Sequence, residues 1–249
     1  MHSPAIREQA MELVRSGLND CEVARRTGIS RTTIRDWRRP SYQSRSGRSP
    51  RVTCPRCWRA SPPLSFSDDD YAELLGIYLG DGYIVRMGRT FRLRVYLDSA
   101  YPCIVDESKA LLQRCFPSNP VGVVFGHEGR MTVLSVYSSH LPCVFPQHGR
   151  GMKHLRKIEL EAWQEQRIQT SPWRFLRGLI RSDGCVFINR TGPYEYLSYD
   201  FANRSRDILD LFGRTCDAVG VEYRRYATRI RVYRRASVAL MQANVGLKR

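Results

Sequence analysis

Two apolar runs of helical character dominate the hydrophobic pattern of this chain, one at residues 74–82 and the other at residues 175–184. Each run contains two small residues four positions apart and ends in Asp-Gly. Small residues with that spacing share one face of a helix, so two such helices can approach each other closely. The pattern predicts a close helix pair, with these small residues on the facing sides: Gly76 and Gly80 in the first run, Gly178 and Ser182 in the second.

Strands with one apolar face follow both runs. Every second residue is apolar between residues 91 and 98, and the same alternation recurs around Ile230 and Val232. A period of two with one apolar face is typical of antiparallel strands whose other side is exposed. These exposed sides are basic, because they carry Arg92 and Arg94 in the first segment and Arg229 and Arg231 in the second.

The elements predicted along the chain make its second half a repeat of its first. The first half is expected to contain a helix at 67–81, strands at 83–85 and 91–98, a helix at 103–115, strands at 121–125 and 131–137, and a short helix near Leu141. The second half is expected to contain a helix at 172–182, strands at 186–189 and 196–201, a helix at 205–219, strands at 221–226 and 228–233, and a helix at 236–244. Two copies of one order of elements indicate an internal repeat.

A separate helical module precedes the repeat. Its first helix is expected to stop at Gly17, and Asn19 or Asp20 can cap a second helix. Gly28 stands where a turn needs a positive φ, and Ser30 can cap a third helix. The apolar positions of the three helices are Ile6, Ala10, Leu13, Val14, Val23, Ala24, Ile34 and Trp37.

The third of these helices, residues 31–38, has a polar face that suits a DNA major groove. The module resembles the helix-turn-helix of resolvase and transposase DNA-binding domains. The alternative is a solvated basic helix within a three-helix bundle. The residues expected to contact DNA are Arg31, Thr32, Thr33 and Arg35.

A basic segment at residues 41–66 separates this module, residues 1–40, from the repeat, and its polar composition predicts a linker. The segment contains Cys54-Pro-Arg-Cys57, which is half of a zinc site. No second Cys-x-x-Cys completes a Zn²⁺ site, so two reduced thiols without metal are the alternative. The other ligands would have to come from elsewhere, and the candidates are His148, His154, Cys103 and Cys143.

Charge narrows the class of partner. The 249 residues include 40 Lys and Arg against 24 Asp and Glu, which gives a formal net charge of +16. Such an excess favours a polyanion, and Arg suits phosphate and guanine in particular. No apolar run reaches the roughly 20 residues that span a bilayer, and no signal-peptide pattern opens the chain. We therefore expect a cytoplasmic, nucleoid-associated protein with reduced thiols.

The two Asp-Gly pairs place a carboxylate at the C-terminal end of each predicted helix. The helix dipole disfavours negative charge there, so Asp81 and Asp183 are poorly placed as structural residues. If the helices pair, the two carboxylates repel each other unless a cation lies between them. A divalent metal ion is the usual solution. Asp-Gly turns that merely end helices are the alternative.

The paired runs closely resemble the repeated signature of the LAGLIDADG homing endonucleases. The first run matches the signature at Leu74, Gly76, Gly80, Asp81 and Gly82, and the second matches it at Gly178, Leu179, Ile180, Asp183 and Gly184. Neither run keeps the inner acid of the signature, since Leu79 and Arg181 occupy its positions. That acid is not the metal ligand in the family, so the departure leaves cleavage open.

The resemblance implies an α+β fold made of two αββαββα halves with pseudo-two-fold symmetry, whose saddle-shaped antiparallel sheets lie on the DNA major groove. The halves would span about residues 67–146 and 172–249, with a connector at 147–171. The implied activity is Mg²⁺-dependent hydrolysis of both strands of double-stranded DNA by a monomer on a pseudo-symmetric site. The residues implied in it are Asp81 and Asp183 as metal ligands, Lys153 and Lys248 near the attacking water, and Asp98 and Asn203 as residues that orient the water.

Two functions compete on these features. The first is a site-specific double-strand DNA endonuclease of the homing type. The second is a DNA-binding transcriptional regulator that uses the same fold without cutting. The retained Asp residues favour the enzyme, whereas the added helix-turn-helix and the missing inner acids favour the regulator. An RNA-binding splicing helper shares the fold and the charge.

Overall fold

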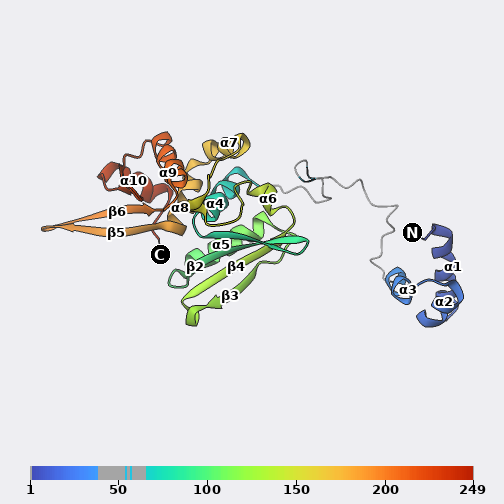
Figure 1. The fold of residues 1–249 in the computed structure, drawn as a ribbon. Coiled ribbons are helices and arrows are strands. Elements are labelled where there is room, and N and C mark those ends of the chain that lie inside the picture. Colours follow the sequence, from blue (N-terminus) through green and yellow to red (C-terminus); the bar gives the residue numbers. More distant parts are fainter. Residues whose placement is uncertain (1, 39–53, 55–56, 58–65, 249) are drawn as a thin grey trace. The chain divides into compact units, whose positions relative to one another are not determined.

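The structure is a computed structural model that describes residues 2–38, 54, 57 and 66–248 (Figure 1). These residues form two compact units: residues 2–38 belong to the first, and Cys54, Cys57 and residues 66–248 belong to the second. The cysteine pair of the predicted linker is therefore part of the second unit. Within the described ranges, no helix is both long and apolar enough to cross a membrane.

The first unit consists of three short helices around a small core. The helices are α1 (Pro4–Arg15), α2 (Asp20–Thr27) and α3 (Arg31–Arg38). The buried side chains are Ala10, Val23, Ile29, Ile34 and Trp37. Ile6, which the sequence pattern places on the apolar face of α1, is instead exposed and is not part of the core of this unit.

Capping residues define the ends of these helices as the sequence predicted. The Asn19 side chain accepts hydrogen bonds from the main-chain N–H groups at the start of α2. Gly28 ends that helix in the left-handed region, with φ of 69°. The Ser30 hydroxyl accepts a hydrogen bond from the N–H of Thr33 at 3.2 Å, which caps α3.

The first half of the second unit is an antiparallel sheet with helices on one face. Its elements are α4 (Asp68–Leu79), β1 (Gly82–Met87), β2 (Thr90–Asp98), α5 (Pro102–Cys115), β3 (Gly122–Gly126), β4 (Met131–Ser138) and α6 (Leu141–Val144). The strand order is β1-β2-β4-β3. The predicted alternation in β2 is confirmed: Leu93, Val95 and Leu97 are buried, while the arginines between them are not.

The second half repeats this order. Its elements are α8 (Pro172–Asp183), β5 (Gly184–Thr191), β6 (Tyr194–Ala202), α9 (Arg206–Ala218), β7 (Arg224–Arg225), β8 (Arg229–Val232) and α10 (Arg235–Asn244). The strand order is β5-β6-β8-β7, as in the first half. The hairpin of β5 and β6 extends away from the helices (Figure 1). The predicted α+β fold of two similar halves is thus confirmed.

The strand predicted at residues 221–226 is much shorter than expected. Of residues 221–226, only Arg224 and Arg225 pair with β8. Val221 is buried in the core directly after α9, and the main-chain N–H of Glu222 donates to Ser237 Oγ at 2.9 Å. A side chain from α10 thus satisfies a backbone donor that a longer strand would have used in its ladder.

α4 and α8 pack against each other and join the two halves. A Cβ atom at Gly76 would lie 2.6 Å from the carbonyl oxygen of Phe175, and a Cβ atom at Gly178 would overlap the carbonyl oxygen of Glu73. Backbones this close leave no room for a side chain between them. The close approach predicted from the small residues is present.

The connector between the halves contains η3 (Lys153–Leu155) and α7 (Ala162–Thr170). Gln164 of α7 is fully buried and donates a hydrogen bond to the Tyr71 hydroxyl of α4 at 2.7 Å. That hydroxyl donates in turn to the carbonyl oxygen of Val144 in α6 at 2.8 Å. These bonds hold α7 of the connector against α6 and the N-terminal part of α4, whereas Lys153 of the connector lies at the C-terminal end of α4.

Candidate active site and DNA-binding surfaces

Asp81 and Asp183 lie at corresponding ends of the paired helices. α4 ends at Leu79 with Gly80 as its C-cap, so Asp81 follows directly, whereas α8 continues through Asp183. The two ends are close, because a Cβ atom at Gly80 would lie 3.3 Å from Asp183 Oδ2. Both acids are half-buried. The structure therefore brings together the two residues that the sequence singled out.

The electrostatics of this pair favour a bound cation. Burial and then the charge of Asp183 raise the pKa of Asp81 to about 7, against the opposing charges of Lys248 and Lys153. Burial also raises the pKa of Asp183, and Lys153, Asn203 and Lys248 oppose that shift. Two neighbouring carboxyls that resist ionisation form a donor set that a hard divalent cation stabilises.

Asn203 orients one of the two acids. Its Nδ2 donates to Asp183 Oδ2 at 2.7 Å, and its Oδ1 accepts from the main-chain N–H of Ser205 at 2.8 Å. The second bond determines which end of the amide faces Asp183. Asp98, the predicted counterpart in the first half, is exposed and accepts a hydrogen bond from the main-chain N–H of Ala100 at 2.9 Å. Of these two predicted residues, Asn203 is the one that contacts an acid.

Lys153 and Lys248 bind the carbonyl groups at the ends of the two helices. Lys153 Nζ donates to the carbonyl oxygens of Tyr78 (2.7 Å), Gly80 and Gly82 (3.1 Å). Lys248 Nζ donates to the carbonyl oxygens of Ser182 (2.7 Å) and Gly184 (2.9 Å). Because a helix C-terminus attracts cations, both ammonium groups are well placed, and each partly offsets the charge of the Asp beside it.

Burial shifts the titration of both lysines toward neutral pH. It lowers the pKa of Lys153 to about 8, against the effects of Asp183 and Asp81. It lowers the pKa of Lys248 as well, and the same two acids oppose the shift. An ammonium group with a pKa of about 8 is mostly protonated at pH 7 but can exchange a proton with nearby water.

A cavity of about 860 Å³ opens beside the acids. Its lining includes Asp183, Lys153 and Asn203, together with His148 and His154 from the connector. Both histidines were candidate zinc partners of the cysteine pair, and the structure places them here instead. Asp183 and Lys153 contribute charged groups of opposite sign to this lining, beside apolar side chains such as Leu79 and Ile84.

Arg181, which occupies the position of the missing inner acid, belongs to an ion-pair network. It contacts Glu73 of α4 at 3.2 Å and also Glu107 of α5. Glu73 is 7% exposed and pairs further with Arg174 (3.3 Å) and Arg177 (3.4 Å) of α8. A buried carboxylate needs such partners, so Arg181 serves the contact between the helices.

The outer face of the first sheet is basic and aromatic. Arg92 lies over the Tyr137 ring, 5.2 Å from its centroid, and donates to Ser135 Oγ at 3.0 Å. The Nε atoms of Arg92 and Arg94 are buried without a hydrogen-bond partner among the described residues. Those two Nε atoms are enclosed by protein, so they are not themselves open to a ligand at the surface. Both residues lie on the face where the sequence predicts DNA contacts, and those contacts stay a prediction.

The corresponding face of the second sheet is partly neutralised. Arg231 donates two hydrogen bonds to Asp200 Oδ2, at 3.2 and 2.8 Å, and Arg229 lies 3.6 Å from the same oxygen. Asp200 stands opposite Arg231 in the strand register, and it is 8% exposed. Arg231 is therefore engaged within the sheet, whereas Arg229 remains exposed.

The polar face of α3 has the composition expected of a recognition helix. Arg31, Thr32 and Arg35 are exposed, while Ile34 and Trp37 are buried on the other side. Thr33 is half-buried, and its hydroxyl lies 2.8 Å from that of Ser30. The Thr32 hydroxyl also lies 3.0 Å from that of Ser30, so both threonines contact the residue that caps their helix, while Arg31 and Arg35 are exposed.

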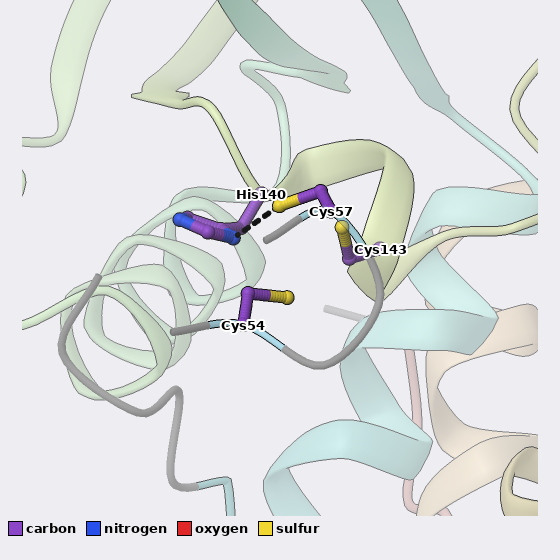
Figure 2. A group of neighbouring side chains, drawn as sticks. All are labelled: Cys54, Cys57, His140 and Cys143. Atoms are coloured by element: carbon purple, nitrogen blue, oxygen red, sulfur yellow. Dashed lines mark hydrogen bonds between the residues drawn. The ribbon is translucent and has the colours of Figure 1, made fainter. Parts of the chain in front are cut away.

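Cys54 and Cys57 lie beside α6 with two further candidate ligands (Figure 2). Their sulfur atoms, Cys143 Sγ and a ring nitrogen of His140 all lie within 4.8 Å of one another. Cys143 was among the predicted partners, whereas Cys103 is exposed on α5. His140 was missed, although His140-Leu-Pro-Cys143 repeats the ligand spacing of Cys54-Pro-Arg-Cys57 and was a readable signal.

Solved structures with a similar fold include the homing endonuclease I-DmoI. A structure of its mesophilic variants has a TM-score of 0.50 at 16% identity and covers 72% of this chain and 96% of that chain. I-DmoI in complex with DNA and Mn also has a TM-score of 0.50 at 16% identity, covering 73% of this chain and 98% of that one. The fold is LAGLIDADG-like. The N-terminal LAGLIDADG domain of DUF199/WhiA has a TM-score of 0.48 at 15% identity, covering 75% and 85% of the two chains.

The homeodomain-like domain family matches residues 1–39. Together with the three capped helices, this match makes the first unit a helix-turn-helix. No curated protein matches the chain. At such low identities the structural similarities establish the fold alone and not the activity.

Proposed function

We propose that this chain is a site-specific double-strand DNA endonuclease of the LAGLIDADG type that hydrolyses phosphodiester bonds with Mg²⁺. The proposal rests on the neighbouring pair Asp81 and Asp183, two half-buried acids at equivalent helix ends, both with raised pKa values. Acids that merely ended helices would have no reason to be buried together, whereas perturbed pairs are common at functional sites. α4 and α8 then carry the two copies of the LAGLIDADG motif.

The donor set at this pair fits a hard divalent cation, because it combines carboxylate oxygens, negative charge and partial burial. Asp81 and Asp183 would hold the metal. Mg²⁺ bound there would supply positive charge to the attacking water and to the leaving 3′ oxygen. Asn203 keeps the Asp183 carboxylate in one orientation through its 2.7 Å hydrogen bond. Lys153, with a pKa of about 8, can take up or return a proton at Nζ, and Lys248 holds the equivalent place.

Two surfaces would bind double-stranded DNA. The first is the outer face of the sheets, with Arg92, Arg94 and Arg229, and the second is the α3 face of the helix-turn-helix. The corresponding organisation is a helix-turn-helix domain at residues 1–40, a linker from residue 41 and a cleavage domain from residue 67. One chain supplies both halves, so a monomer would act on a pseudo-symmetric site.

A non-cleaving DNA-binding regulator is the second candidate. Two observations favour it: the homeodomain-like match at residues 1–39 and the ion-paired Arg181 where the family has an acid. Both candidates bind duplex DNA, but the regulator has no use for two carboxyls at the helix ends. They therefore differ in one measurable property, which is metal-dependent strand breakage.

Incubation of the full-length protein with a randomised duplex library and Mg²⁺, followed by sequencing of bound fragments and new ends, separates the two candidates. We expect a selected site with breaks in both strands that disappear in chelator. The matched control is the double variant Asp81→Asn/Asp183→Asn, which should select the same site without breaks. Wild-type protein that selects a defined site and yields no Mg²⁺-dependent ends would overturn the endonuclease and leave the regulator.

A further inference from the structure

A second cluster of metal-ligating side chains lies at α6, among different neighbours from the acid pair. We propose that Cys54, Cys57, His140 and Cys143 bind one Zn²⁺ in a closed, structural site of the second unit. This site anchors the segment that leads from the helix-turn-helix to the body of the second unit. Its ligands come from two short stretches of chain with the same two-residue spacing, Cys54–Cys57 and His140–Cys143.

The positions of the ligand atoms are close to those of a zinc centre. Cys57 Sγ lies 3.4 Å from His140 Nδ1, and all four ligand atoms lie within 4.8 Å of one another. Bonds of about 2.3 Å to sulfur and about 2.0 Å to nitrogen place neighbouring atoms of a tetrahedral site roughly 3.5–3.8 Å apart. Small side-chain rotations therefore suffice to close the cluster on one ion. Figure 2 shows the four side chains gathered around one point.

Half of this site is held in place by the core of the second unit. His140 is 4% exposed, and its main-chain N–H donates to Ser138 Oγ at the end of β4 (3.1 Å). The N–H of Cys143 donates to the His140 carbonyl oxygen at 2.8 Å, and Leu141 and Val144 of the same turn are buried. His140 and Cys143 thus keep their positions without metal, and the ion recruits the other two ligands to them.

The composition of the cluster selects zinc. Three of the four ligand atoms are sulfurs, and all four lie within 4.8 Å of one another. Sulfur atoms crowded in this way become stable thiolates beside a metal ion. Three sulfurs and an imidazole are soft ligands that favour zinc over Mg²⁺. A disulfide would use two sulfurs and leave the third and the imidazole of His140 unexplained.

With four protein ligands the site has no open position for substrate, so its role is structural. Zinc there ties Cys54, a residue within the predicted linker, to α6 of the second unit. Along the sequence, residues 39–53 separate the end of α3 from Cys54, whereas residues 39–65 separate it from Phe66. A shorter tether raises the effective concentration of one DNA-binding surface near the other. This last consequence rests on the proposed function, but zinc binding itself does not.

Metal analysis of the full-length protein, purified without chelator, tests the proposal. We expect about one equivalent of zinc per chain, as for other four-ligand sites. Cys143→Ser and His140→Ala should each lose the zinc, while Cys103→Ser, an exposed cysteine outside the cluster, should keep it. Cobalt in place of zinc should give the absorption bands of tetrahedral thiolate coordination in the wild type and not in Cys143→Ser.

The wild-type protein gives an answer even if these variants fail to fold. Alkylation of the native protein followed by intact-mass measurement should show three further reactive thiols once a strong chelator is added. Wild-type protein without stoichiometric zinc, even after incubation with zinc under reducing conditions, would overturn the proposal. A disulfide among these cysteines in zinc-free protein would overturn it as well. Neither measurement involves DNA, so the zinc proposal is tested independently of the proposed endonuclease activity.

Discussion

The two halves of the second unit share one strand order but differ in how their charges are arranged. In the first half, α4 contributes the buried Glu73, and Asp81 at its end has a pKa raised to about 7. In the second half, α8 contributes the arginines that pair with Glu73, and Asp183 at its end receives a hydrogen bond from Asn203. The repeat has kept the two acids and a lysine at each helix end, while the other partners of the two helices differ.

The two sheets differ in the same way. Arg92 and Arg94 of the first sheet form no ion pair within the described part of the chain, whereas the charge of Arg231 in the second is paired with Asp200. The edge strands differ too, since β3 spans Gly122–Gly126 and β7 only Arg224–Arg225. Backbone geometry is thus common to the two halves, while chemistry depends on side chains that each half supplies alone. DNA contacts should be stronger in the first half.

Removing either acid should have the largest effect. We expect Asp81→Asn and Asp183→Asn each to lower double-strand cleavage by about 10³-fold or more, because a lost metal ligand removes several kcal/mol of transition-state stabilisation. DNA binding should be unchanged or slightly tighter. Strand-specific cleavage of an end-labelled target measures both effects, and residual nicking of one strand would show that the halves do not share their metal. Asp106→Asn, an exposed acid on α5, is the control. If both acid variants cleaved DNA at the wild-type rate, Asp81 and Asp183 would have no role in the reaction.

Close packing of α4 and α8 can be broken by a single methyl group. Gly178→Ala should lower the free energy of unfolding by about 3 kcal/mol, because its Cβ meets the rigid carbonyl oxygen of Glu73. Gly80→Ala meets the side chain of Ser182 instead, so Ser182→Gly should relieve it and should not relieve Gly178→Ala. Urea denaturation of these variants, with Gly122→Ala as a mild control, measures the difference. Equal rescue of both would contradict the close approach of the two helix backbones at Gly178.

Stability without metal should depend on pH mainly through Asp81. Its folded pKa of about 7 lies above the unfolded value, so its contribution to stability is present below about pH 4 and is lost as the pH rises through 7. In chelator, the free energy of unfolding should fall by about 1–3 kcal/mol between pH 5 and pH 8, a value reduced for the partial exposure of the acid.

Asp81→Asn should flatten this pH profile, because its amide does not ionise. Asp183→Asn should flatten it less, since the hydrogen bond from Asn203 and the neighbouring lysines oppose the shift of Asp183. Urea denaturation across the pH range measures the three profiles. Identical profiles in wild type and Asp81→Asn would show that this carboxyl is not the one that holds the proton.

Substitution of single arginines on the two sheets should have the smallest effects of these changes, and the loss of DNA affinity should differ between the sheets. Arg92→Ala and Arg94→Ala should each weaken DNA binding by about tenfold and reduce the salt slope by about 0.9 for each phosphate group that is no longer bound. Arg231→Ala should weaken binding less and destabilise the fold more, because it leaves Asp200 buried without its main partner. Fluorescence anisotropy at several salt concentrations compares them. Equal losses from both sheets would contradict the difference between the halves.

Local patterns predicted most of this fold because they record contacts between neighbours in sequence. The alternation in β2 gave its buried face, and Asn19, Gly28 and Ser30 marked helix ends through backbone groups within a few residues. The small residues and terminal acids of the two helical runs predicted their pairing as well. The pairing could be predicted because the chain contains two such segments. Either segment alone would also fit an ordinary helix.

Contacts between distant segments were not predictable in this way. The spacing of His140 and Cys143 marks a possible pair of ligands, but not that they contact Cys57, which lies 83 residues earlier in the sequence. The ion pair of Arg231 depends on the strand register that sets Asp200 opposite it. β7 is short where the main-chain N–H of Glu222 donates to the hydroxyl of Ser237 in α10 and not to a neighbouring strand. Lys153 and Lys248 each donate hydrogen bonds to carbonyl groups at a helix end. Sequence spacing does not show this structural role.

Metal binding at the acid pair is the most direct test of the central claim. Mn²⁺ binding to the complex of the protein with its selected DNA can be followed by electron paramagnetic resonance, with Asp81→Asn, Asp183→Asn and the Asp106→Asn control in parallel. We predict bound Mn²⁺ in the wild type and the control, and binding at least about tenfold weaker in each acid variant, since each removes one charged oxygen ligand. Mn²⁺ binding that is absent from the wild type, or equally strong in both acid variants, would contradict a metal-dependent nuclease site at Asp81 and Asp183.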